Sequence, residues 1–430
     1  MGPVKREQRM QKLFANPTWA LVAAFGTYFC MYGYRKPYTS ASFIDAGLFG
    51  LSFKFGMVIA QTLGYVLAKW IGIKFVSEIK PARRISAIIA LIGFAELMLL
   101  LFGIASRPWN LLFMLLNGLP LGVIFGLVLS FLEGRKQTEF LVAGLCASFI
   151  LSDGVSKSVG ATLLLWGVSE NWMPFMAGLV FMVPTAIFIA MLACVPKPTE
   201  TDIKARSERV PLTGHDRRAF FNKYAPGLIA IIAVYLFVTL LRSVRADFAV
   251  EIWAGLGYKQ TPDLFTTSEL LVSLGVITIT GLAIFIRNHY IAFRFSLFTS
   301  LAGFAILLLS LGGLNGVLGN FGFMVLVGLG VYLPYVAVHA IIFERLIAIT
   351  RERATVSFLM YIVDSVGYTG YIGLMLFRYA MPADIAVLPL FLDISLLLGV
   401  GGALLTLFCY VYFKSKLKPY VNQNPNLAIG

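Results

Sequence analysis

Charged residues are scarce in this chain of 430 residues, because Asp, Glu, Lys and Arg together make up only 13% of it. Soluble globular domains carry about 25% charged residues, so the composition excludes an ordinary soluble domain. A hydrophobic content of 59% also excludes an intrinsically disordered chain. The composition is typical of helices surrounded by lipid, and since a helix crosses a bilayer with about 20 residues, the length allows about a dozen spans.

Cysteine and histidine are also rare, with four and three residues. All four cysteines lie inside apolar runs, and the sequence has no CxxC motif or cysteine–histidine cluster, which argues against a disulfide framework and a metal site. It also has no nucleophile–base arrangement and no phosphate-binding glycine loop. We therefore expect neither an enzyme nor an ATP-driven pump, and no cofactor.

The sequence does have twelve apolar segments, separated by charged, polar or Gly/Pro-containing breaks. We expect an all-α membrane protein with twelve transmembrane helices in two pseudo-symmetric six-helix bundles. The N-terminal bundle is predicted at 1–195, a hydrophilic cytoplasmic linker at 196–223 and the C-terminal bundle at 224–430. The predicted spans cover about 17–38, 50–76, 84–105, 109–132, 138–167, 172–195, 224–250, 265–286, 290–311, 320–346, 354–378 and 384–413.

The positive charges are distributed unevenly between the two sides that this topology defines. With the N-terminus inside, 24 Lys and Arg lie on the inner side and 4 on the outer side. Cytoplasmic loops carry the excess of Lys and Arg in membrane proteins. We therefore predict a multi-pass protein of the cytoplasmic (inner) membrane with both termini in the cytoplasm. The net charge of +14 is then mostly a topology signal, and no nucleic-acid partner is needed to explain it.

The two halves of the chain also repeat each other. Glu133 precedes Asp153 by twenty positions near the fifth span, and Glu344 precedes Asp364 by twenty near the eleventh. Duplicated transporter halves fold as two similar bundles, with the substrate site near the midplane at their interface. The alternative is a chance similarity between apolar helices.

Several basic residues lie inside the predicted spans, where a charge costs about 2.5–3.5 kcal/mol on insertion scales. Tyr28, Tyr32 and Arg35 are spaced four and three apart, which places them on one helix face. Tyr65 and Lys69 are spaced four apart on the second span. Charges in such positions usually face a polar site or a partner, so these five residues are candidates for a binding site.

Arg242 lies well inside the seventh span, in the other half of the chain from Arg35. A guanidinium forms two parallel hydrogen bonds to phosphate or carboxylate. The two arginines are therefore predicted to clamp one oxyanion, with tyrosines lining the organic part or donating to its oxygens. Alternatively, the arginines pair with Asp153, Asp247 or Glu269 only to hold helices together.

Acidic residues in the spans are candidates for gating or coupling. Asp153 and Lys157 are spaced four apart, so an ion pair within one helix is expected. Lys36 is predicted to bridge to Asp247 and Glu269, and an arriving anion would compete for the cations and release the carboxylates. The lone histidine of the tenth span, His339, is expected to pack.

Four segments together resemble the major facilitator superfamily and, within it, the organophosphate:phosphate antiporters, which include glycerol-3-phosphate and hexose-phosphate transporters. The resemblance lies in TYFCMYGYRKPYTSASF, GYVLAKWIGIKFVSE, FVTLLRSVRADF and the acidic residue of the eighth span. It implies that Arg35 and Arg242 bind phosphate with help from Lys69, Tyr28, Tyr32 and Tyr65. It also implies an interdomain switch formed by Lys36, Asp247 and Glu269.

The chain departs from that family at two places. The fifth-span histidine of the family is missing, and Ser152, Asp153 and Lys157 occupy the region. Arg245 is an additional charge in the seventh span. These departures bear on the substrate and on the coupling.

We therefore predict a monomeric secondary transporter working by alternating access, which exchanges an organic phosphate or similar small anion for inorganic phosphate across the lipid bilayer. One alternative is a proton-coupled symporter or exporter of another anion, with Asp153 or Asp364 as the proton carrier. Another is a sensor with the same fold that binds the anion without moving it.

Overall fold

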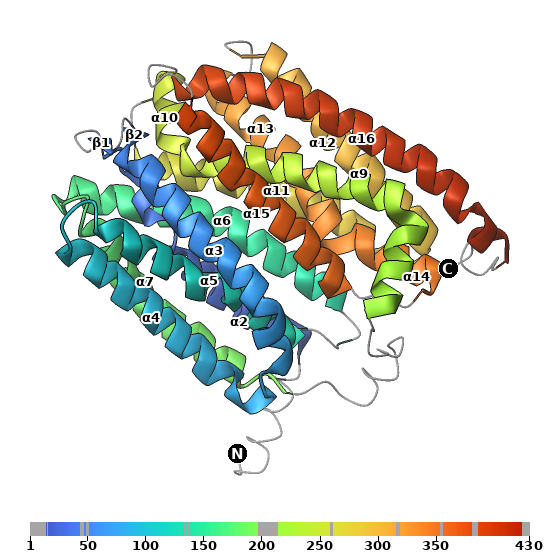
Figure 1. Ribbon diagram of the computed structural model, residues 1–430, viewed down its shortest axis with the longest axis horizontal. Helices are drawn as coiled ribbons and strands as arrows, with labels where there is room; N and C mark the ends of the chain where they lie inside the picture. The colour runs from blue at the N-terminus through green and yellow to red at the C-terminus, as the bar shows by residue number, and fades with distance from the viewer. Residues whose placement is uncertain are drawn as a thin grey trace, which may run out of the picture. The chain divides into compact units, whose positions relative to one another are not determined.

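The computed structural model describes residues 14, 16–43, 47–48, 51–132, 135, 138–196, 214–258, 261–314, 319–352, 356–380 and 386–423. The chain divides into two compact units. Unit 1 consists of Met1–Arg209 and Thr261–Thr266, and unit 2 of Val210–Gln260 and Thr267–Gly430. Figure 1 shows that both are built from long helices.

Unit 1 begins with helix α2, whose start is determined by its first residues. The Asn16 side chain accepts a hydrogen bond from Thr18 N at 3.0 Å, and Pro17 occupies the first helical position. Both are preferred helix-start residues. A two-residue antiparallel pair, β1 (Gly47–Leu48) and β2 (Leu51–Ser52), precedes the second span. The helices are α2 (Pro17–Met31), α3 (Phe53–Glu78), α4 (Arg84–Ile104), α5 (Asn110–Leu132), α6 (Thr138–Leu165) and α7 (Met173–Ala193).

The first span is less regular than its sequence suggests. Its α-helix ends at Met31 and continues as two 3-10 turns, η1 (Tyr32–Tyr34) and η2 (Pro37–Ser40). Pro37 has no N–H to continue the helical ladder, and its ring restricts the residue before it. Arg35 and Lys36 lie in the break between the two turns, so the helix face predicted for Tyr28, Tyr32 and Arg35 ends in a tighter turn.

Unit 2 contains the remaining helices. Part of the stretch predicted as linker, residues 214–223, forms the start of α9, which has a non-helical residue at Tyr224. Residues 197–213 of the predicted linker lie outside the described ranges. The tenth span contains a five-residue π-helical turn, η4. The elements are α9 (Gly214–Asp247), α10 (Ala249–Gly255), α11 (Pro262–Ile284), α12 (His289–Gly312), α13 (Gly319–Ala337), η4 (Val338–Ile342), α14 (Phe343–Thr350), α15 (Val356–Ala380) and α16 (Val387–Gln423).

The helices of the two units pack in the same pattern. In unit 1, α2 contacts α5, α6 and α7; in unit 2, α9 contacts the corresponding spans α13, α15 and α16. Among the described residues, eleven helices are long and apolar enough to cross a membrane. The shorter α2, extended by η1 and η2, takes the place of the first predicted span. The prediction of an all-helical membrane protein in two similar six-helix bundles is therefore confirmed.

Glycines allow a close helix contact in unit 1, between α3 and α5. A Cβ at Gly118 would lie 2.2 Å from Gln61 O, and a Cβ at Gly64 would lie 2.0 Å from Leu115 O. Both obstacles are backbone atoms, so a side chain at either position requires the helices to separate. Small residues at such contacts are typical of membrane helix pairs.

The Gly118→Ala variant is therefore expected to be destabilised by about 1–3 kcal/mol, the usual cost of overpacking. The matched control is Gly93→Ala on α4, where an added Cβ meets nothing within 4 Å. Thermal unfolding of the purified variants in detergent measures the difference. Equal stability of the two variants would contradict the close packing of α3 on α5.

Candidate functional site

In unit 1, Arg35 is buried against tyrosine rings. Its guanidinium carbon Cζ lies 4.0 Å from the ring centroid of Tyr65 and 5.6 Å from that of Tyr32. Its side chain is only 6% exposed. A cation over an aromatic face is attracted by the negative charge of that face. The rings therefore hold the guanidinium in place and leave its N–H groups at the edge of its plane.

Lys69 joins the same group of aromatic residues. Its Nζ lies 5.2 Å from the Tyr65 centroid and 5.5 Å from that of Phe125 on α5. Tyr28 packs edge-on against Phe125 at 5.2 Å and against Tyr32 at 5.8 Å. Five of the six residues predicted to bind substrate thus gather at the junction of α2, η1, α3 and α5, together with Phe125. The sixth, Arg242, belongs to unit 2.

Buried amides support the break in the first span. Gln61 Nε2 donates to Arg35 O at 3.0 Å and to Asn117 Oδ1 at 2.8 Å. Asn117 Nδ2 donates to Tyr34 O at 3.2 Å and to Ala95 O at 3.0 Å. Carbonyl groups that the broken helix leaves without a ladder partner are satisfied in this way, and the backbone of Arg35 is fixed.

In unit 2, Arg242 has a closely similar environment. Its Cζ lies 4.7 Å from the Tyr335 centroid and 5.8 Å from that of Tyr368, and its Nη2 donates to Tyr368 Oη at 3.0 Å. It is 7% exposed. Each unit therefore buries one arginine against two tyrosine rings.

A hydrogen-bonded chain adjoins Arg242. Tyr235 Oη donates to Asp364 Oδ1 at 2.5 Å and lies 3.3 Å from His339 Nδ1. The rings of Tyr235 and His339 both stack on Tyr335, with centroid distances of 5.0 and 5.5 Å. The chain joins α9, η4 and α15, and its three polar side chains are buried.

The sequence also contains a repeated spacing that marks residues of unit 2 beside Arg242. Tyr235 lies seven positions before Arg242, as Tyr28 lies seven before Arg35. Asp364 and Tyr368 are spaced four apart, like Asp153 and Lys157. Spacing that is repeated between the halves thus identifies Tyr235 and Tyr368, which repeated charge does not.

On α6, the ion pair expected from the spacing of four is present, between Lys157 Nζ and Asp153 Oδ2. Both residues are about 2% exposed. Among the described residues, three further buried atoms of this helix have no hydrogen-bond partner: Ser152 Oγ, Asp153 Oδ1 and Ser156 Oγ. Buried polar atoms without a protein partner need water or a ligand, and α6 packs against η1 and η2, the two turns on either side of Arg35.

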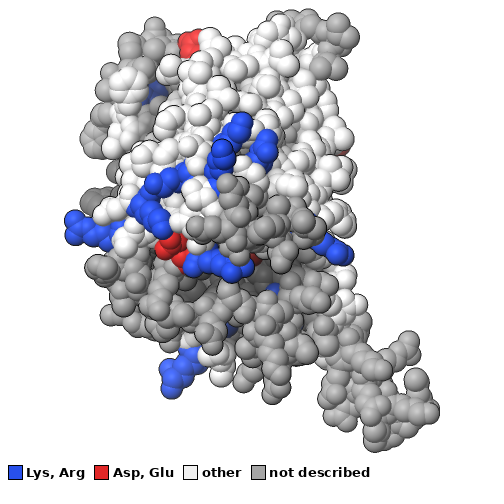
Figure 2. Space-filling view, turned by 90° about the vertical axis from the view of Figure 1, so that its right-hand side faces the viewer, with Lys and Arg blue, Asp and Glu red and all other residues white. Residues whose placement is uncertain are grey.

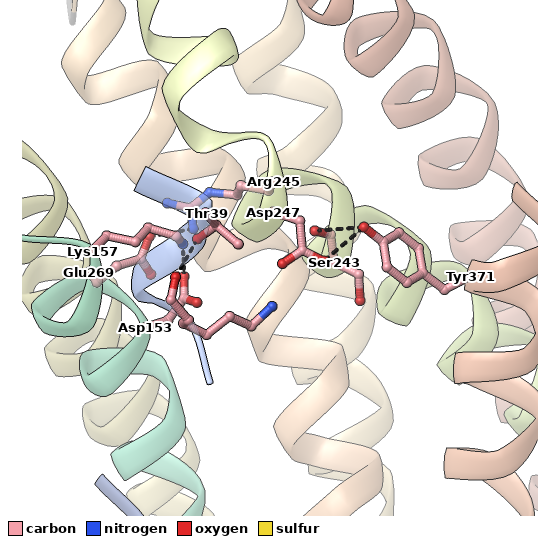
Figure 3. A network of polar contacts seen from close by, with 9 residues as sticks. Thr39, Asp153, Lys157, Ser243, Arg245, Asp247, Glu269 and Tyr371 are labelled. Carbon is pink, nitrogen blue, oxygen red and sulfur yellow. Dashed lines mark hydrogen bonds and ion pairs between the residues drawn. The ribbon is translucent and has the colours of Figure 1, made fainter. Parts of the chain in front are cut away.

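The predicted switch residues of unit 2 have partners within that unit. Glu269 Oε1 lies 2.6 Å from Arg245 Nη1. Asp247 Oδ2 accepts from Tyr371 Oη at 2.8 Å, a contact drawn with the other polar pairs in Figure 3. The additional seventh-span charge, Arg245, is thus part of an ion pair. Lys36 is buried in the break between η1 and η2 of unit 1, and its predicted bridge to the acidic residues stays a prediction.

A family model matches residues 37–416, most of the chain, and carries the description "Family of unknown function (DUF5690)". The chain belongs to the DUF5690 family. No curated protein sequence matches this DUF5690 chain significantly.

Solved structures do resemble the DUF5690 chain. A bacterial homologue of the human lysosomal transporter Spinster, in an inward-facing and unoccupied conformation, gives a TM-score of 0.55 at 13% identity, covering 94% of this chain and 98% of the homologue. The nucleoside transporter NupG gives a TM-score of 0.54 at 14% identity, covering 93% of this chain and all of NupG. At such identities the likeness shows the fold alone, so this multi-pass membrane protein has the major facilitator fold.

Proposed function

We propose that the protein is a secondary transporter that moves a small organic anion, an organic phosphate or a close analogue, by alternating access and exchanges it for inorganic phosphate. The observation that carries the proposal is the arginine buried against tyrosine rings in each unit, Arg35 in unit 1 and Arg242 in unit 2. The major facilitator fold supports transport as the activity.

The chemistry of these residues favours an oxyanion. A guanidinium presents N–H donors in a planar fork that matches two oxygens of a phosphate or carboxylate. Lys69 adds a positive charge beside Arg35, and tyrosine hydroxyl groups supply further donors. The two buried cations of unit 1, Arg35 and Lys69, favour a doubly charged group such as a phosphate monoester over a single carboxylate, because buried charge must be balanced.

Membrane placement and gating are part of the proposal. The excess of Lys and Arg on one side of the predicted spans favours an orientation with both termini in the cytoplasm. The membrane is proposed to be the inner membrane. Figure 2 shows basic side chains gathered on one face with few acidic ones. Lys36, Asp247 and Glu269 are proposed to exchange partners when the anion binds, which would link binding to the opening of one side.

A binding screen tests the choice of substrate. Inorganic phosphate, glycerol-3-phosphate and hexose phosphates are added to the purified protein, with glycerol and the free sugars as controls, and thermal unfolding is followed. A ligand at a hundred times its dissociation constant stabilises by about 2.7 kcal/mol, so phosphate-bearing compounds are expected to raise the unfolding temperature and the controls are not. Stabilisation by carboxylates alone would contradict the proposal.

A further inference from the structure

Three residues from distant parts of unit 2 form a continuous hydrogen-bonded chain, Asp364, Tyr235 and His339. Tyr235 has one hydroxyl proton, and the 2.5 Å contact gives that proton to Asp364 Oδ1. The hydroxyl oxygen is then available to accept from His339 Nδ1 at 3.3 Å, a tautomer assigned from the network. The order of donors is therefore histidine to tyrosine to carboxylate.

The backbone around His339 is unusual. Residues 338–342 form a π-helical turn after Pro334, which lies inside α13. Isolated π turns inside helices occur frequently at functional sites, because the extra residue changes the direction of a side chain. Here the turn places the imidazole on the Tyr335 ring, the same ring against which the guanidinium of Arg242 lies.

We propose that Asp364, Tyr235 and His339 are a proton relay that takes up one proton when an anion binds at Arg242. The inference rests on the proposed function, because it takes the anion to be the ligand of Arg242. In this proposal, the carboxylate of Asp364 offsets the charge of the Arg242 guanidinium when no anion is bound. With it, the anion takes over that balance, and a buried carboxylate retained beside it would leave an uncompensated negative charge.

The transfer is balanced in atoms and charge. A hydronium ion first gives a proton to Nε2 of His339, which makes the imidazole an imidazolium and leaves a water molecule. Its Nδ1–H bond then breaks as an O–H bond forms on Tyr235, while the original phenolic proton moves to Asp364 Oδ1. The imidazole becomes neutral, the carboxylate becomes a carboxylic acid, and the tyrosine is unchanged.

Other charged and titratable groups around the relay come from each element that packs there. Arg242 belongs to α9, Tyr335 to α13 and Tyr368 to α15. The helices α12 and α14 also pack against η4, and two of their residues contact each other, Arg345 Nη1 lying 2.9 Å from His289 Nδ1. Their remaining charged groups are Arg294, which bonds to Tyr410 Oη, and Glu344.

Infrared difference spectroscopy of the purified protein tests the relay, with inorganic phosphate as the probe. Phosphate is expected to produce a carboxylic-acid band in the wild type that is missing in Asp364→Asn and retained in the control Asp393→Asn, which changes an exposed carboxylate of α16. The ratio of the phosphate dissociation constants of the wild type and Asp364→Asn should change about tenfold per pH unit, as linkage of one proton requires. The titration of phosphate itself affects the dissociation constants of both proteins equally, so it cancels in their ratio.

The outcomes separate the two proposals. Phosphate binding without the band, or with a band that persists in Asp364→Asn, overturns the relay and leaves the proposed function standing. If phosphate does not bind, the proposed function fails, and acidification alone decides on the relay. A carboxylic-acid band that appears on acidification supports the relay if the pH of its midpoint moves in Tyr235→Phe and His339→Gln. A midpoint pH that is unmoved in both variants overturns the relay. This test does not depend on whether Asp364→Asn folds.

Discussion

Phosphate uptake by the Arg242→Lys variant is expected to fall about ten- to a hundredfold, with folding intact. Lysine retains the positive charge but loses the planar fork, and a hydrogen bond to a charged group contributes about 1.5–3 kcal/mol. The same loss is expected for Arg35→Lys in unit 1. Uptake of labelled phosphate into proteoliposomes measures both variants.

Each arginine has a matched control in its own unit. Arg294 lies over Tyr410 at 5.4 Å and donates to its hydroxyl group at 2.7 Å, much as Arg242 does with its tyrosines. Arg107 lies over Phe53 at 4.7 Å. The variants Arg294→Lys and Arg107→Lys should keep most of the uptake. Near-normal uptake by Arg242→Lys or Arg35→Lys would remove that arginine from the anion site.

The single variants Asp153→Asn and Lys157→Gln are expected to be destabilised by about 3–5 kcal/mol each, because either change leaves an uncompensated charge in a buried place. The double variant should regain most of that stability, since a missing ion pair is often nearly neutral. Thermal unfolding of the three variants in detergent measures the non-additivity.

Phosphate binding by the same proteins decides what the pair does. If Asp153 and Lys157 only neutralise each other, the double variant binds phosphate about as well as the wild type. A stable double variant that has lost phosphate binding would instead make Lys157 a substrate ligand. Additive losses of stability would show that the two side chains do not act as a pair.

The spans and the Asp153–Lys157 pair were predictable because both depend on local sequence. An apolar segment long enough to cross a bilayer must form a helix, since its backbone groups have no other partners there. A spacing of four places two side chains on one helix face wherever that helix lies. Neither inference needs to know which helices are neighbours.

The chain formed by Tyr235, His339 and Asp364 was not predictable in the same way. Tyr235 is 104 positions from His339 and 129 from Asp364. The three residues meet only through the packing of α9, η4 and α15. The π turn that directs His339 has no clear sequence signature beyond Pro334. A lone histidine and tyrosines in apolar spans are therefore indistinguishable from packing residues until the fold is known.

The break after Met31 lies between these two cases. Pro37 predicts the end of the helical hydrogen-bond ladder, because it has no N–H to donate. The amide contacts of Gln61 and Asn117 that stabilise the break come from α3 and α5. The sequence indicated that Arg35 is near the end of its span. The packing determines that its guanidinium lies against Tyr65.

Exchange of phosphate across proteoliposomes tests the central claim most directly. Vesicles holding the purified protein are loaded with unlabelled phosphate or left empty, and entry of labelled phosphate is followed. An exchanger takes up labelled phosphate many times faster into loaded vesicles than into empty ones. In vesicles that hold the Arg242→Lys variant, loading with phosphate should no longer speed the uptake. Uptake that is equal in loaded and empty vesicles, or binding of phosphate with no uptake in either, would contradict exchange by this protein.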